Sequence, residues 1–245
     1  MDEIHDELGS LLASGVCLMV HFAPPCSTFS RARCRSSATR LRTAEFPQGL
    51  PKRGWECHSA NLVARHTLNL VEWLAKKGAA VSMENPESSW LWKYLDFDAD
   101  LEPVDVTISA CLFGASYQKH TRLRCWNWVP PTLLDKKCRF SGDVFSCGRT
   151  REAPHTSLEF GSHSTADAAE YVPDLCTAWA SDIRGFFDDA PDYLAARREV
   201  LEISDGIVKR HVFRGPSDQT TRERHLEEDR GCSAGCRRPA GHADI

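Results

Sequence analysis

Residues Val16-Cys17-Leu18-Met19-Val20-His21-Phe22 form a short apolar run between Gly15 and Pro24-Pro25. The run is partly β-branched and too short for a typical helix, so it predicts a buried strand of the kind found in parallel sheets. The two prolines end the strand and stiffen the chain that follows.

A helix and a second strand follow this first strand. Between 59 and 77 the apolar residues recur at a spacing of three or four, which predicts an amphipathic helix with Ser59 as its N-cap. Gly78 is expected to end the helix, and residues 79–83 form a short apolar strand before Asn85-Pro86. Strand, long helix and strand in this order predict a βαβ crossover, and therefore an α/β fold.

The rest of the chain adds elements around this unit. Alternating apolar residues predict strands at 104–111 and 122–129, which we expect to form an antiparallel hairpin at one edge of a mixed, mostly parallel sheet. Residues 165–187 predict a helix broken in two by Pro173, and 191–203 a further helix. Residues 204–245 are highly charged and predict a disordered tail. The expected organisation is a catalytic half at 1–130, an irregular and helical extension at 131–203, and the tail.

Composition restricts the class of protein. The 245 residues are 42% hydrophobic and 26% charged, with a net charge of -4, which excludes a collagen-like or wholly disordered chain. The longest apolar runs are too short to cross a membrane, so no membrane partner is expected. The acidic N-terminus does not resemble a signal peptide, and the eleven cysteines are scattered. We therefore expect an intracellular protein, nuclear or cytoplasmic.

Two short motifs carry chemistry. Cys26 follows Pro24-Pro25 at the end of the first strand, and Glu84 lies at the end of the second. Neighbouring parallel strands end at the same edge of a sheet, where ligands of α/β proteins bind, so a thiolate and a carboxylic acid are expected to share one site. A thiolate can attack an electron-poor ring while the acid protonates a ring nitrogen.

These motifs resemble the DNA cytosine-5 methyltransferases. Pro24-Pro25-Cys26 with Phe29-Ser30 is similar to their catalytic loop, and Glu84-Asn85-Pro86 is similar to the Glu-Asn-Pro form of a phage- and transposon-associated branch. A third block, residues 113–122, resembles the family's Gln-x-Arg-x-Arg motif, with His120 in place of the first arginine. The resemblance covers residues 16–130 and implies a partial Rossmann-like methyltransferase sheet.

The resemblance assigns roles. Cys26 would add to C6 of a flipped-out cytosine, Glu84 would contact N3, and Arg122 would contact the carbonyl and order the other two. The residues expected to bind the substrate around these three are Pro25, Ser30, Asn85, Gln118, Arg31, Arg33 and Arg35.

The family's cofactor is S-adenosylmethionine, bound by a glycine-rich loop before the catalytic cysteine. Only 23 residues precede Pro24, and they contain no such loop, so the cofactor-binding residues are unknown. The expectation is a truncated gene model, a decayed copy, or a split enzyme whose second chain supplies this half. Methyl transfer by this chain alone is not expected.

Nucleic acid is the expected partner. Residues 31–53 contain seven basic side chains, Arg31, Arg33, Arg35, Arg40, Arg42, Lys52 and Arg53, and one acidic side chain, Glu45. Such a loop beside the nucleophile suits phosphate contacts. DNA is the expected substrate, and RNA is the alternative that this chemistry leaves open.

A metal ion is not expected. Cys138, Cys147, His155 and His163 offer ligand types for zinc, but their spacings are long and irregular. The tail residues Cys232 and Cys236, with His225 and His242, are a weaker set. Two alternatives to the enzyme remain: an inactive nucleic-acid-binding remnant of a mobile element, and a zinc-stabilised interaction module.

Overall fold

The computed structural model describes residues 2–14, 19–31, 33, 36–158 and 170–188. The helices are α1 (Asp2–Ala13), α2 (His58–Lys76), α3 (Leu91–Tyr94) and α4 (Pro173–Asp188). The strands are β1 (Met19–Phe22), β2 (Ala80–Pro86), β3 (Val104–Ser109), β4 (His120–Trp126), β5 (Phe140–Ser141) and β6 (Val144–Phe145). Short 3-10 turns include η2 (Gly54–Cys57), η3 (Ala99–Leu101), η4 (Ala110–Phe113) and η5 (Pro131–Leu133).

Four strands form a mixed sheet in the order β1-β2-β4-β3. β1 and β2 are parallel, with Phe22 opposite Met83, and α2 connects them, which confirms the predicted crossover. β4 is antiparallel to both β2 and β3, so the predicted hairpin is also present. The expectation of a mostly parallel sheet is wrong, since β1–β2 is the one parallel pair among the described strands. β4 lies between β2 and β3 and runs antiparallel to both of them.

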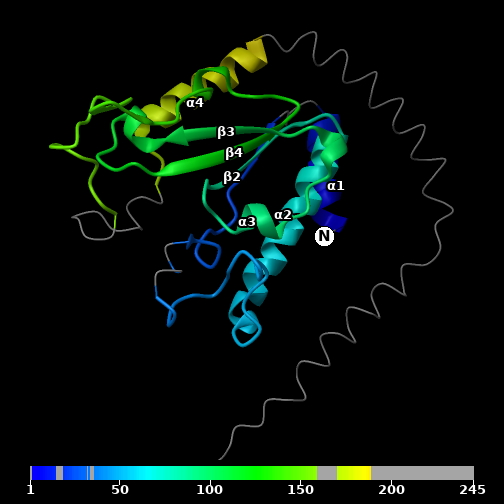
Figure 1. The fold of residues 1–245 in the computed structure, drawn as a ribbon. Helices are drawn as coiled ribbons and strands as arrows, with labels where there is room; N and C mark the ends of the chain where they lie inside the picture. The colour runs from blue at the N-terminus through cyan, green and yellow to red at the C-terminus, as the bar shows by residue number, and fades with distance from the viewer. Residues whose placement is uncertain (1, 15–18, 32, 34–35, 159–169, 189–245) are drawn as a thin grey trace, which may run out of the picture. The chain divides into compact units, whose positions relative to one another are not determined.

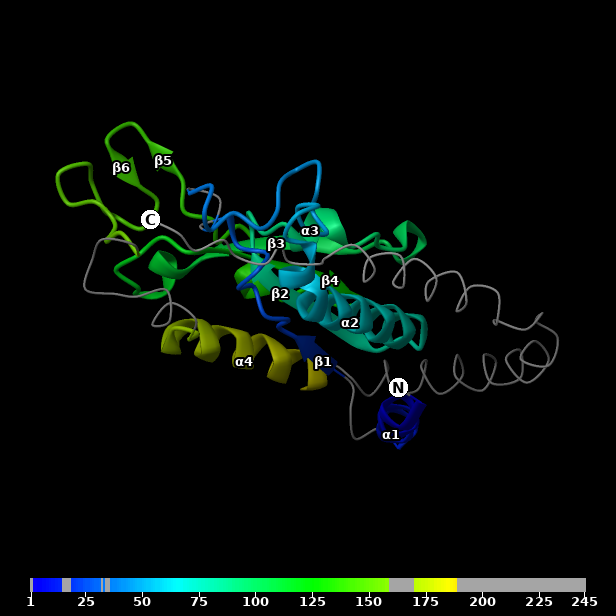
Figure 2. The ribbon, with the colours of Figure 1, turned by 90° about the horizontal axis from the view of Figure 1, so that it is seen from below.

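Helices cover both faces of this sheet (Figures 1 and 2). On one face, Val71 and Leu74 of α2 pack with Val81 and Met83 of β2, and Leu12 of α1 joins the same core. On the other face, α4 packs against β3 and β4, where Leu175 and Trp179 meet Val106, Ile108 and Leu123. Apolar residues two positions apart in a strand face the same core: Val81 and Met83 of β2 face α2, whereas Val106 and Ile108 of β3 face α4.

The extension after residue 130 therefore shares a core with the sheet. α4 is one helix that begins at Pro173, where a proline is tolerated because the first helical N–H has no partner inside the helix. The predicted break at Pro173 is thus the start of a helix, and the earlier part of the predicted helix, 165–169, lies outside the described residues. The predicted helix at 191–203 and the tail at 204–245 also lie outside them.

Two further details differ from the sequence analysis. The N-cap of α2 is Cys57, which makes no side-chain cap hydrogen bond, so Ser59 lies inside the helix. α1 was not predicted. His5 of α1 packs edge-on against Trp73 of α2, with ring centroids 4.9 Å apart. Among the described residues, no helix has the length and apolar character needed to cross a membrane.

Candidate functional site

The Cys26 loop and Glu84 belong to neighbouring parallel strands, and one hydrogen bond ties them together. The loop leaves β1 after Phe22, whose partner on β2 is Met83, so Cys26 and Glu84 belong to the same end of the strand pair. Asn85 Nδ2 donates a hydrogen bond of 2.8 Å to the Pro24 carbonyl oxygen. Asn85 is fully buried, so this bond holds the loop close to the residue that follows Glu84.

Glu84 is a buried acid with two polar neighbours. Burial raises the pKa of its carboxyl group, while the positive charge of Lys119 and a hydrogen bond donated by Tyr171 lower it, and the net direction is upward. Glu84 is 8% exposed, and its Oε1 makes no hydrogen bond with the residues that the structure describes. A carboxyl group with a raised pKa and an unsatisfied buried oxygen is suited to bind a polar ligand.

Cys26 is exposed and electrostatically linked to the same groups. Desolvation raises the pKa of its thiol, the positive charge of Lys119 lowers it, and the negative charge of Glu84 raises it, with a net rise. A thiolate is the reactive form of cysteine, so Lys119 is the group that would favour the nucleophile. Lys119 was not among the predicted site residues.

A second polar chain leads to Glu84 from β1. Ser82 Oγ lies 2.9 Å from Nδ1 of His21, and Tyr171 Oη lies 3.2 Å from Nε2. Trp179 of α4 packs edge-on against the imidazole, with ring centroids 4.7 Å apart. Desolvation lowers the pKa of His21 to about 4, so the ring is neutral at pH 7. A neutral ring that donates from Nε2 leaves the Tyr171 hydroxyl proton free to point at Glu84.

Arg122 lies on the other face of the sheet from Glu84. It pairs in register with Asn85, whereas Leu123 is the residue opposite Glu84. Arg122 Nη1 lies 3.2 Å from Asp105 Oδ2, and its guanidinium lies over the Trp92 ring. The charge that acts on both Cys26 and Glu84 belongs to Lys119, three residues before Arg122. Arg122 is therefore not among the charged groups that act on Cys26 and Glu84.

The other predicted substrate residues are dispersed. Pro25 is exposed beside Cys26, and Ser30 is half-buried at the end of the same loop. Gln118 donates from Nε2 to the Cys138 carbonyl oxygen at 3.3 Å, so it faces the segment after β4.

The arginines of the loop divide into two groups. Arg31 and Arg33 are exposed, and the Arg31 guanidinium lies 4.4 Å from the centre of the Trp90 ring; Arg35 lies outside the described residues. Arg42, in contrast, is 1% exposed and bonds to Thr28, Pro47 and Asn61. Arg53 pairs with Glu56. Part of the predicted phosphate-binding charge is therefore structural.

Tryptophans pack in both cores of the sheet. Trp90 and Trp126 are buried in the core under α2. Trp128 packs instead with the core under α4, because Asn127, at φ 60°, breaks the alternation of β4. Trp126 and Trp128 therefore contribute to different cores.

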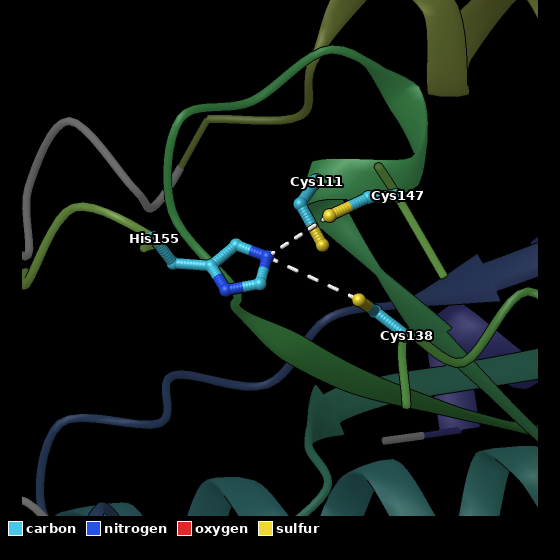
Figure 3. Close-up of side chains that lie close together, drawn as sticks. All are labelled: Cys111, Cys138, Cys147 and His155. Atoms are coloured by element: carbon cyan, nitrogen blue, oxygen red, sulfur yellow. Dashed lines mark hydrogen bonds between the residues drawn. The ribbon is translucent and has the colours of Figure 1, made fainter. Parts of the chain in front are cut away.

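A separate cluster corrects the expected cofactors. Cys111, Cys138, Cys147 and His155 converge, and their candidate ligand atoms all lie within 4.8 Å of one another (Figure 3). The expectation of S-adenosylmethionine with no metal is therefore overturned, because the cofactor chemistry that these residues offer is that of a metal ion. Sequence reasoning omitted Cys111, which lies 27 positions before Cys138, and included His163, which lies outside the described residues.

Comparison of the chain with family models, with curated proteins and with solved structures finds no match.

Proposed function

We propose that this chain binds a cytosine base of DNA at Cys26 and Glu84, and that Cys26 adds reversibly to C6 of the ring. The observation that carries the proposal is the unsatisfied Oε1 of Glu84, a buried carboxyl oxygen electrostatically coupled to an exposed cysteine. The parallel β1–α2–β2 unit supports the reading of the sheet as part of a Rossmann-like methyltransferase fold.

The proposed step is a conjugate addition. The Cys26 thiolate forms a bond to C6, the electrons of the C5–C6 double bond form a C4–C5 double bond, and those of the C4–N3 double bond move to N3. N3 receives the proton of the Glu84 carboxyl group, so no charge builds up on the ring. Return of the proton to Glu84 and release of the sulfur reverse the step.

Each neighbouring group has a role in this step. The raised pKa of Glu84 favours the protonated carboxyl group that this step requires. The positive charge of Lys119 stabilises the Cys26 thiolate before the attack. The Tyr171 hydroxyl holds the Glu84 carboxyl, so that its other oxygen faces the ligand. Lys119, Thr121 and Tyr171 also line one small pocket.

The proposal is tested with an oligonucleotide whose target cytosine is replaced by 2-pyrimidinone, a base with a more electrophilic C6. We expect a covalent adduct that survives denaturing electrophoresis and has the summed mass of chain and oligonucleotide. C26S should abolish it, and E84Q should slow it by roughly 10²-fold or more, the usual contribution of a positioned acid. The matched control is C176S, since Cys176 is an exposed cysteine on α4.

The outcomes separate the alternatives. An adduct that persists in C26S would reject Cys26 as the nucleophile. Absence of an adduct in the native chain, with salt-dependent binding to the same duplex, would favour an unreactive nucleic-acid-binding remnant. Matched DNA and RNA oligonucleotides in parallel identify the nucleic acid, and faster reaction with RNA would correct the assignment to DNA.

A further inference from the structure

We infer that Cys111, Cys138, Cys147 and His155 bind one zinc ion, which holds the segment 134–158 against the end of the β3–β4 hairpin. This inference is independent of the proposed cytosine chemistry, because it rests on a different set of residues. Figure 3 shows the three cysteine side chains converging on the His155 ring.

The spacing of the ligand atoms fits a tetrahedral ion. His155 Nε2 lies 3.2 Å from Cys147 Sγ and 3.9 Å from Cys138 Sγ. Ideal zinc–sulfur and zinc–nitrogen bonds place neighbouring ligands roughly 3.5–3.8 Å apart, between the two observed distances. Three thiolates and one imidazole are a ligand set that selects zinc over magnesium or calcium.

The backbone around the ligands is fixed by hydrogen bonds. Ser109 Oγ, at the end of β3, accepts a bond of 2.8 Å from the Cys138 N–H, and Gln118 bonds the Cys138 carbonyl. Gly148, at φ 86°, forms the turn directly after Cys147, a conformation that favours glycine. Ser146 N–H donates to the Arg139 carbonyl at 2.9 Å, which closes the loop between the second and third cysteines.

Segment 134–158, which carries three of the four ligands, has almost no core of its own. All residues from 134 to 158 are described, and Cys138 is the one fully buried side chain among them. Its two-stranded sheet, β5–β6, has two residues in each strand, and Phe140 and Val144 are exposed. A hairpin of this size is not stable in water by itself, so another interaction must order the segment.

A metal ion supplies this interaction. Leu133 anchors the start of the segment in the core under α4, and Leu158 packs at its other end against Ala110 and Tyr117. Between these anchors, the four ligands would join the segment to η4, the turn that contains Cys111. Four protein ligands leave no open position, so the ion has a structural role and no part in the reaction.

The test is metal analysis of the full chain purified under reducing conditions. We expect one zinc per chain by native mass spectrometry and elemental analysis. C147S and H155A should each lose the ion, and both change half-buried side chains, so the sheet should remain folded. The matched controls C176S and H58A change a cysteine and a histidine elsewhere and should keep one zinc per chain.

Hydrogen exchange provides a second measurement that does not depend on any variant. Removing zinc from the native chain with a chelator should increase amide exchange across 134–158 while β2 and β4 stay protected. A chain that takes up no zinc when reduced, or C147S and H155A variants that retain it, would overturn the inference. A mass lower by two hydrogens, with Cys138 joined to Cys147, would overturn it in favour of a disulfide.

Discussion

Asn85 Nδ2 donates a hydrogen bond of 2.8 Å to the carbonyl oxygen of Pro24, across 61 positions of sequence. This bond joins the loop that carries Cys26 to the strand that carries Glu84. Asn85 is fully buried, and its Oδ1 has no hydrogen-bond partner among the described residues. Both halves of the candidate site therefore depend on one buried amide.

Replacing Asn85 with aspartate should destabilise the fold and release the loop. The carboxylate cannot donate to Pro24, and the lost bond together with a buried acid should cost about 1–3 kcal/mol or more. Urea denaturation, followed by circular dichroism, measures this loss. Asn61→Asp is the comparison, because Asn61 is a half-buried amide that bonds outside the β1–β2 pair. Equal stability of N85D and the native chain would show that the bond contributes nothing.

Lys119→Gln and Glu84→Gln should shift the reactivity of Cys26 in opposite directions. Lys119 lowers the pKa of the Cys26 thiol and Glu84 raises it. K119Q should therefore raise the pH at which Cys26 is alkylated at half its maximal rate, and E84Q should lower that pH. Both shifts are measured by iodoacetamide labelling at a series of pH values, with the extent of labelling quantified on the peptide that contains Cys26. Cys176 in the same sample is the internal reference. Shifts of the same sign would contradict the assigned electrostatics.

The sequence predicts the β1–α2–β2 unit well because its signals are local. The apolar spacing lies within each element, Gly78 lies between α2 and β2, and the crossover follows from the order of the elements. The place of β4 between β2 and β3 depends on long-range pairing, which single-sequence periodicity does not encode. For the same reason β2 continues past the predicted strand 79–83 to Pro86, which is paired with Thr121.

The candidate site also combines residues that local motifs predict with residues that long-range contacts bring together. Cys26 and Glu84 lie in short motifs that can be recognised alone, whereas Tyr171 reaches His21 across 150 positions. Cys111 was missed as a ligand because the fold, and not the spacing, brings it to Cys138. Arg122 matched a motif, but strand alternation places it on the opposite face from Glu84, and one position of register decides this.

Arg42→Ala should destabilise the protein, although Arg42 lies in a basic loop. Its guanidinium donates to Thr28, Pro47 and Asn61 and lies 3.7 Å from the centre of the Phe29 ring. Truncation leaves several buried acceptors unpaired, which should cost about 2–4 kcal/mol. Thermal or urea unfolding measures the effect. Arg33→Gln, at an exposed position, should leave the stability unchanged, and a similar loss in both variants would contradict the distinction.

His21 should make stability depend on pH in a defined window. Its folded pKa of about 4 lies below the ordinary value of 6.5, so the unfolded chain binds the proton more readily. The contribution of neutral His21 to the free energy of unfolding is present above pH 6.5 and is lost as pH falls from 6.5 towards 4. The step should be shallow, because the residue is exposed and solvent screens its charge. The urea concentration at the midpoint of unfolding should fall as pH is lowered through this window in the native chain, and should depend less on pH in H21N. An equal pH dependence in both chains would reject the lowered pKa of His21.

Arg31→Gln with Arg33→Gln should weaken binding to DNA and reduce its salt dependence. Both side chains are exposed on the loop after Cys26, where they can reach the backbone phosphates beside a bound base. Loss of two phosphate contacts should lower the slope of log affinity against log salt by up to about two. Fluorescence anisotropy with a labelled duplex at several salt concentrations measures it. Lys76→Gln with Lys77→Gln removes the same charge at the end of α2, just before β2 begins, and therefore at the opposite end of the strand from Glu84. A salt slope that falls equally in both double variants would assign the binding to net charge, and not to this loop.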